Sequence, residues 1–176
     1  MIKNLHLLKY DNYGGNMDNI AVQKVDIMAY AGKWFSLYTI PGLFDKDWKH
    51  TTHTYVIHPD GYYAVFTNYK LPTDNKQRYI RSKLSVIRGS GNARMKAQVV
   101  WPFKTDYWVI ELADDYSHAV IGHPRCKHLS ILSRKAEIEA SLLSAIIERC
   151  HEKGYDTSKL VSQEHKDTPV LDVIPA

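Results

Sequence analysis

The sequence contains a regular succession of eight short segments rich in Tyr, Val, Ile, Thr and Trp, with turn residues between them. β-Branched and aromatic side chains favour the extended backbone of a strand. Because the connections are of hairpin length, the pattern predicts an all-β fold, either an antiparallel up-and-down barrel or a sandwich. The eight predicted strands cover residues 33–40, 52–58, 62–69, 78–87, 93–101, 107–112, 118–121 and 128–132.

One helical pattern follows the last predicted strand. Across residues 135–153 apolar side chains recur at spacings of three and four, and Gly154 ends the pattern. Cys150 falls on the apolar stripe, where a small buried side chain is expected. The sequence therefore predicts a set of strands followed by a single helix.

The length of 176 residues suits one domain with a core of its own. We expect residues 1–20 to form a flexible polar arm, residues 21–160 to form the domain, and residues 161–176 to form a C-terminal tail. The stretch from Asp156 onward is polar and carries two prolines, so no regular structure is predicted for it. Met17 is an alternative starting residue.

Charge and hydropathy exclude several classes of partner. The net charge of +4 comes from basic residues scattered along the chain, which does not favour nucleic-acid binding. No window approaches 18 consecutive apolar residues, so no membrane-spanning helix is predicted. The first residues lack the apolar stretch of a secretory signal, and two cysteines make no disulfide framework. A reduced, cytoplasmic location is expected, or a periplasmic or membrane-associated one if a targeting segment has been removed.

Three short motifs occur in order along the chain. Gly32 and Trp34 open the first predicted strand, Asp115 and Tyr116 precede the seventh, and a Leu-Ser-Ile-Leu-Ser run ends in Arg134. Over residues 25–160 this arrangement resembles the lipocalin family, and within it the branch of the bacterial outer-membrane lipocalins and apolipoprotein D. The resemblance implies an eight-stranded antiparallel barrel with the C-terminal helix packed outside.

The resemblance also implies structural roles for the motif residues. In lipocalins the arginine of the third motif packs across the tryptophan of the first, so Arg134 and Trp34 are expected to close the narrow end of the barrel. A guanidinium over an indole gains about 0.5–2 kcal/mol. Thr105-Asp-Tyr107 matches the spelling of the second motif as well, but it precedes the sixth predicted strand, and we interpret it as a hairpin connection.

An eight-stranded barrel is just wide enough to hold one small ligand. If Trp34 points inward, strict alternation places Ser36, Tyr38 and Ile40 on the same side of the first strand. The apolar face of the fifth strand adds Met95, Ala97 and Val99. An aliphatic and tyrosine wall without a buried charge suits an acyl chain, with hydroxyls near the mouth for a head group.

One position departs from the branch that the chain resembles. That branch usually has a tryptophan where this chain has Ser130. If Ser130 faces inward, we expect a larger and more polar pocket. The function predicted is the binding, transport or storage of a small hydrophobic ligand such as a fatty acid or lysophospholipid.

Catalytic and metal-binding alternatives have weaker support. The stretch 123–128 contains two His and one Cys but no evident fourth ligand, so no metal is expected. Cys126 falls in a loop and Cys150 on the helix, which disfavours a thiol enzyme inside the barrel. His50, His53 and His58 are interpreted as solvated or hydrogen-bonded side chains, which disfavours a haem binder. No cofactor is expected.

A third class of function is a surface module. Phe35, Phe44 and Trp48 could form an exposed patch at the open end, next to Lys46 and Lys49, which would favour a peripheral membrane contact or a homodimer. The alternative is that the loop 43–48 folds over the pocket as a partial lid.

Overall fold

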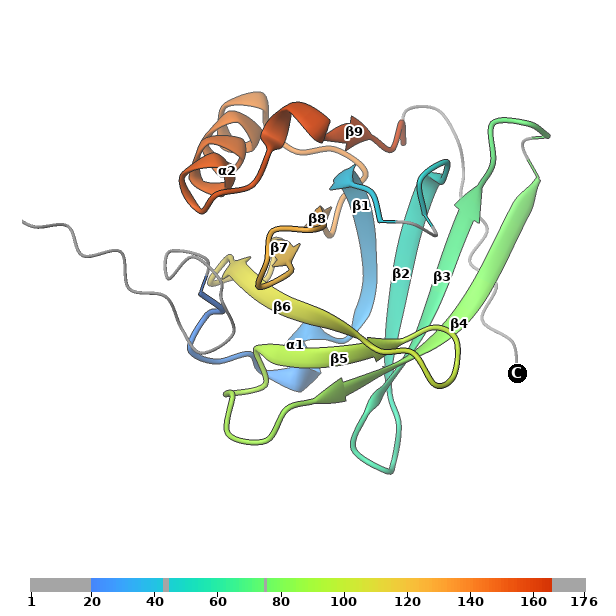
Figure 1. Cartoon of the computed structure of the whole chain (residues 1–176), viewed down its shortest axis with the longest axis vertical. Helices are drawn as coiled ribbons and strands as arrows, with labels where there is room; N and C mark the ends of the chain where they lie inside the picture. The colour runs from blue at the N-terminus through green and yellow to red at the C-terminus, as the bar shows by residue number, and fades with distance from the viewer. Residues whose placement is uncertain (1–19, 43–44, 75, 166–176) are drawn as a thin grey trace, which may run out of the picture.

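The structure is a computed structural model that describes residues 20–42, 45–74 and 76–165. Its sheet closes on itself, because β1 pairs both with β8 and with β2, and every pairing is antiparallel (Figure 1). The strands are β1 (Gly32–Ile40), β2 (Lys49–Ile57), β3 (Tyr63–Lys70), β4 (Gln77–Val86), β5 (Arg94–Gln98), β6 (Thr105–Leu112), β7 (His118–Gly122), β8 (Leu129–Ser133) and β9 (Val161–Ser162).

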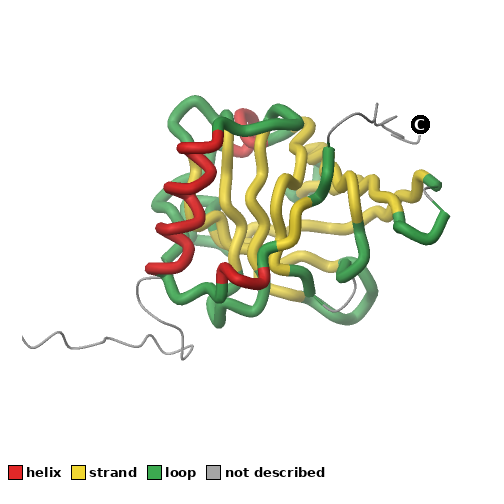
Figure 2. Tube along the Cα trace, turned by 90° about the horizontal axis from the view of Figure 1, so that it is seen from above, coloured by secondary structure: helices red, strands yellow, loops and turns green. Residues whose placement is uncertain are grey.

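The helices lie outside the barrel wall or at its end. α1 (Ile27–Tyr30) is one turn that precedes β1, and its N-cap Asp26 accepts hydrogen bonds from the amides of Met28 and Ala29. α2 (Ala140–Glu152) packs against the outside of the strands (Figure 2), and η1 (Thr157–Lys159) follows it. This is the barrel with an external C-terminal helix that the sequence predicts.

Most predicted strands agree with the structure to within three residues. Two differences bear on the site. β5 ends at Gln98, because Val99 and Val100 already belong to the turn into β6. Thr105 and Asp106, interpreted from the sequence as a connection, belong to β6, where Asp106 pairs with Lys96 and binds its ammonium at 2.7 Å.

The segment after α2 is also more ordered than its sequence predicts. The polar stretch from Asp156 contains η1 and β9, and β9 pairs with β1. Beyond β9 the backbone of Gln163 bridges two strands: its amide donates to the carbonyl of Leu37, and its carbonyl accepts from the amide of His50. β1 and β2 pair only from Gly32 to Phe35, so this segment fills the gap between them toward the open end.

The closed end is held by the residues of the three motifs. The guanidinium carbon of Arg134 lies 3.9 Å from the ring centroid of Trp34. Its terminal nitrogens donate to the carbonyls of Lys33 (2.8 Å) and Ala29 (2.6 Å), and its Nε to that of Tyr116 (3.4 Å). The Trp34 indole donates to the carbonyl of Tyr30 at 2.8 Å. Trp34 is fully buried, so this end is sealed from solvent.

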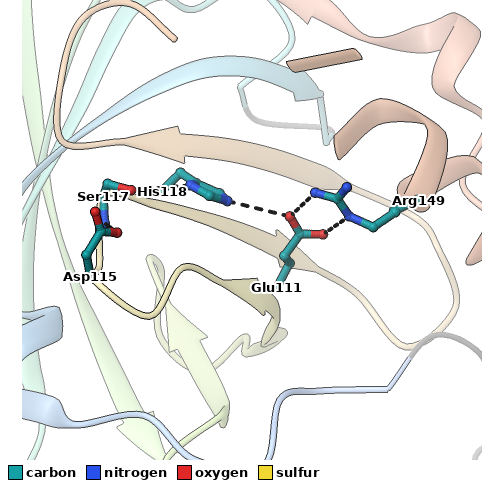
Figure 3. A network of polar contacts seen from close by, with 5 residues as sticks. All are labelled: Glu111, Asp115, Ser117, His118 and Arg149. Carbon is teal, nitrogen blue, oxygen red and sulfur yellow. Dashed lines mark hydrogen bonds and ion pairs between the residues drawn. The ribbon is translucent and has the colours of Figure 1, made fainter. Parts of the chain in front are cut away.

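α2 is fixed to the barrel by an apolar cluster and by one ion pair. Ile146 and Cys150 pack with Ile131 and other apolar side chains on the outer surface of the barrel. Arg149 donates two hydrogen bonds, of 2.9 and 2.6 Å, to the carboxylate of Glu111 on β6, and His118 lies 3.6 Å from the same carboxylate (Figure 3). Within the described ranges, no helix has the length and apolar character that crossing a bilayer requires.

Candidate ligand-binding site

The barrel encloses a cavity of about 180 Å³ that reaches toward the open end. Its mouth is marked by Val99, which lines the cavity and is also 48% exposed. Apolar and aromatic side chains line most of it, and polar side chains gather on one side. The lining residues are Asp45, His53, Tyr55, Val65, Ser82, Leu84, Ala97, Val99, Tyr107, Ile121, His128, Ser130 and Leu132.

Tyrosine hydroxyls form a chain below the apolar part of the cavity. The hydroxyl of Tyr107 lies 2.7 Å from that of Tyr30 and 2.7 Å from that of Tyr55. Burial raises the pKa of Tyr55 to about 12 and the pKa of Tyr30 and Tyr107 well above their usual value. The three phenols are therefore neutral, and they supply hydrogen-bonding groups without charge.

A second, polar chamber of about 50 Å³ adjoins the cavity and shares three lining residues with it, Asp45, His53 and Ser130. Thr39 donates to the carbonyl of Leu129 at 2.9 Å. Thr51 donates to the side-chain oxygen of Gln163 at 2.7 Å. The chamber is lined by Ser36, Thr39, Asp45, Trp48, Thr51, His53, Ser130 and Gln163, so seven of its eight lining residues are polar.

The two histidines of the cavity are neutral at pH 7. Burial lowers the pKa of His53 to about 4, and its Nδ1 lies 2.9 Å from the hydroxyl of Thr67. Burial also lowers the pKa of His128, although the carboxylates of Asp45 and Asp106 oppose that shift. Neither imidazole therefore provides a positive charge for a ligand.

Four of the residues predicted to line the pocket lie in the walls of these two spaces. Ala97 and Val99 line the main cavity, Ser36 lines the chamber, and Ser130 lines both. Met95 is fully buried in the interior cluster below the cavity. Ser130 faces inward, which is the orientation on which the expectation of a more polar pocket depends.

Tyr38 and Ile40 lie on the opposite face, in the cluster beneath α2. The strict alternation assumed for β1 fails because its register against β8 shifts between Ser36 and Tyr38. This β-bulge inserts one extra residue and reverses the faces that follow. Past the bulge it is Thr39 that faces the chamber.

Sequence reasoning missed several lining residues, among them Asp45, His53, Tyr55, Ser82, Tyr107 and His128. For Tyr55 a signal was present: period-two alternation on β2 places Thr51, His53 and Tyr55 on one face. Asp45 lies in a loop that strand periodicity does not reach, whereas alternation within the predicted strand 128–132 places His128 on the same face as Ser130. Two imidazoles thus line the cavity, and that of His53 lies at hydrogen-bond distance from Thr67, within the solvated or hydrogen-bonded roles expected from the sequence.

The cysteines lie outside the cavity wall. Cys150 is buried beneath α2, where burial raises its pKa to about 12, and Cys126 is half-buried in the loop between β7 and β8. Among the described residues, no group of three or more His, Cys, Asp or Glu side chains could hold a metal ion.

The aromatic residues near the first loop do not form one surface. Trp48 stacks on Tyr69 with ring centroids 4.0 Å apart and lines the polar chamber. Phe35 lies against the ring of His165 at 5.3 Å, and both side chains are half-buried or buried. Phe44 lies outside the described residues.

A closed antiparallel barrel with a sealed end, an external helix and an inner cavity defines the class of β-barrels that hold a small molecule inside. The family model for a lipocalin-like domain matches residues 25–165. The chain belongs to the lipocalin family, whose members bind small hydrophobic ligands.

Relatives from plants and bacteria support this assignment. Temperature-induced lipocalin-1 of Arabidopsis thaliana is 32% identical over 157 residues, which cover 84% of this chain and 83% of the plant protein. The outer membrane lipoprotein Blc of Vibrio cholerae is 27% identical over 141 residues, which cover 80% and 82% of the two chains. These similarities extend over most of each chain.

Solved structures show the same fold at lower identity. Insecticyanin from the tobacco hornworm Manduca sexta superposes with a TM-score of 0.63 at 18% identity, over 84% of each chain. Lobster apocrustacyanin A1 superposes with a TM-score of 0.62 at 14% identity, over 77% of each chain. At these identities the likeness is one of fold alone.

Proposed function

We propose that the chain binds one acyl-chain amphiphile, of the class that includes fatty acids and lysophospholipids, for transport or storage. The supporting observation is the cavity of about 180 Å³, whose wall is mostly apolar and aromatic and is polar on one side. An apolar cavity of about 150 Å³ holds a benzene ring. The end of an acyl chain fits along such a wall, while the polar part of the molecule stays near the mouth.

Filling the cavity tests this proposal. In the Ser130→Trp variant the indole occupies the cavity, so the affinity for an acyl-chain ligand should fall by about tenfold or more. A tenfold change in Kd corresponds to about 1.4 kcal/mol of binding free energy. Ser85→Trp is the matched control, because Ser85 lies on β4 next to the inward-facing Leu84 and therefore on the outer face.

The measurement has two parts. Mass spectrometry of an organic extract identifies what the purified protein carries, and titration with a neutral fluorescent probe gives the affinity of each variant. A chain that carries no lipid and binds none of the acyl-chain ligands would contradict the proposal. Equal affinity in the Ser130→Trp and Ser85→Trp variants would place the ligand elsewhere.

A second candidate function is contact with a lipid surface at the open end. Residues 99–103 form the turn between β5 and β6, and Trp101 and Phe103 in it are 82% and 75% exposed. Val99 in the same turn lines the cavity mouth, and Lys104 follows it. Exposed Trp and Phe beside a lysine suit the interface of a bilayer with anionic lipids. The patch differs from the one that the sequence suggested at Phe35, Phe44 and Trp48.

Vesicle sedimentation tests the surface contact. With vesicles of phosphatidylcholine and phosphatidylserine, the double variant Trp101→Ser/Phe103→Ser should lose most of the bound fraction. The control is Met28→Ser, since Met28 is 72% exposed but lies in α1, which precedes the closed end of β1. Unchanged sedimentation of the double variant would contradict a membrane role for this turn.

A further inference from the structure

The described walls of the cavity and of the polar chamber contain no lysine or arginine. Their one carboxylate side chain is that of Asp45, which lines both spaces. The remaining polar groups of the side chains are hydroxyls, one amide, the indole N–H of Trp48 and two neutral imidazoles. A negatively charged head group would therefore meet a carboxylate and no compensating cation.

Three cations of the barrel are engaged in contacts outside these walls. Arg134 donates to three backbone carbonyls behind Trp34. Lys96 binds Asp106 at 2.7 Å, and Lys49 binds both the carbonyl of Ser162 and the carboxylate of Glu164. None of the three lines the cavity or the chamber. Burying a carboxylate or phosphate here would cost free energy without an ion pair to offset it.

The chamber offers several uncharged hydrogen-bonding groups. Among the described residues, the Ser36 hydroxyl and the Gln163 amide nitrogen have no hydrogen-bond partner, and both residues line the chamber. Ser130 at the junction has only a weak 3.4 Å contact with Thr39. Because buried polar groups stabilise a complex only when they are paired, this wall selects a ligand that brings hydroxyls.

We propose that the chamber formed by Ser36, Thr51, Ser130 and Gln163 binds the uncharged, hydroxyl-bearing head group of a single-chain lipid, and that Asp45 excludes carboxylates. The inference rests on the proposed binding of an acyl-chain amphiphile and narrows it, because it favours an uncharged head group over the carboxylate of a fatty acid and the phosphate of a lysophospholipid. A monoacylglycerol has the required chemistry: an acyl chain, no charge, and two vicinal hydroxyls that both donate and accept.

Three ligands with equal chains test the proposal on the full chain: 1-monodecanoylglycerol, decanol and decanoate, measured by calorimetry at pH 7.5. We expect monodecanoylglycerol to bind about tenfold tighter than decanoate, which corresponds to about 1.4 kcal/mol. Decanol should fall between them, because it has one hydroxyl and no charge.

Variants separate charge from hydrogen bonding. Asp45→Asn should tighten decanoate binding about threefold or more and leave monodecanoylglycerol within about twofold. Asp114→Asn is the matched control, since Asp114 is exposed in the turn between β6 and β7. Thr51→Val with Ser36→Ala should reduce the advantage of monodecanoylglycerol over decanol by about threefold to tenfold, the range expected for one lost hydrogen bond.

The outcomes are distinct. Decanoate binding as tightly as monodecanoylglycerol, or an Asp45→Asn variant with unchanged preference, would overturn the assignment of the head group and leave the proposed function in place. Failure of all three ligands to bind would contradict the proposed function itself. The expected order of affinities, monodecanoylglycerol above decanol above decanoate, would support both the head-group assignment and the proposed function if the differences shrink in the chamber variants.

Discussion

At the closed end of the barrel, Arg134 meets Gly32 and Trp34, which lie about a hundred residues earlier in the sequence. Arg134 lies over Trp34, and its guanidinium nitrogens reach the carbonyls of Lys33 and Ala29. Gly32 has a φ of +91°, and a Cβ there would lie 3.4 Å from the guanidinium. A side chain at Gly32 would therefore face both backbone strain and crowding against Arg134.

Replacing Arg134 by lysine tests the value of its planar donor group. A lysine keeps the charge over the indole but cannot reach both carbonyls, so we expect a loss of about 2 kcal/mol in the free energy of unfolding. Urea denaturation measures it. Arg88→Lys, in the exposed turn between β4 and β5, is the control and should change stability little. Equal effects would show that the charge alone matters at Arg134.

Part of the site could be predicted residue by residue. Ser130 was predicted as a pocket residue on the condition that it faces inward, and the lid of Trp34 and Arg134 followed from a resemblance. Alternation on β2 gives the face of His53 but not its burial, and no strand pattern locates Asp45. The burial of His53 depends on β3 and β1 closing around it, and Asp45 reaches the cavity from a loop.

At the scale of the elements, β-strand periodicity carried most of the prediction. Alternation and turn residues located all eight barrel strands, whereas the bulge in β1 left no mark in the sequence. A bulge arises from the fit of β1 against β8 over a distance of 90 residues, as in the contact between Thr39 and Leu129. The order after Asp156 was missed for the same reason, because β9 gains its structure from pairing with β1.

The packing of the segment after α2 depends on one glycine. The hydroxyl of Tyr155 accepts from the amide of His123 at 3.0 Å and donates to its carbonyl at 3.1 Å. A Cβ at Gly122 would overlap this hydroxyl and lie 3.0 Å from Cδ1 of Ile110. Only a residue without a side chain leaves space for Tyr155 against β7.

We expect Gly122→Ala to lower the free energy of unfolding by about 1–3 kcal/mol through overpacking. Tyr155→Phe removes the hydroxyl and its two hydrogen bonds, which costs about 1–2 kcal/mol. The double variant should lose less than the sum of the two, because the loss of the hydroxyl leaves room for the new methyl group. Additive losses in chemical denaturation would contradict this contact.

At the scale of the whole molecule, buried histidines make stability depend on pH. Burial lowers the pKa of His53 to about 4, and burial next to His128 lowers the pKa of His123 to about 4, against a usual value of 6.5. Both side chains therefore prefer the neutral form in the folded state. As the pH falls, the unfolded chain takes up these protons first, so the folded state loses stability between pH 6.5 and 4.

The variant His53→Asn should lose less stability than the original chain on going from pH 7.5 to pH 4.5. One pKa unit corresponds to about 1.4 kcal/mol, so we expect a difference of roughly 2 kcal/mol between the two proteins. Thermal or urea unfolding at both pH values measures it. His151→Asn, on the exposed face of α2, should follow the original chain. Identical pH profiles of stability for all three proteins would contradict the lowered pKa of His53 in the folded state.

The dependence of β1 on later parts of the chain has a consequence for biosynthesis. One edge of β1 pairs with β8, and the gap beyond its pairing with β2 is filled by the segment that carries Gln163. A ribosome makes β1 first, and these partners emerge about a hundred residues later, at roughly 5–20 residues per second. The first strand therefore remains open at one edge for several seconds during translation, and the ligand site is completed only when the segment around Gln163 has emerged.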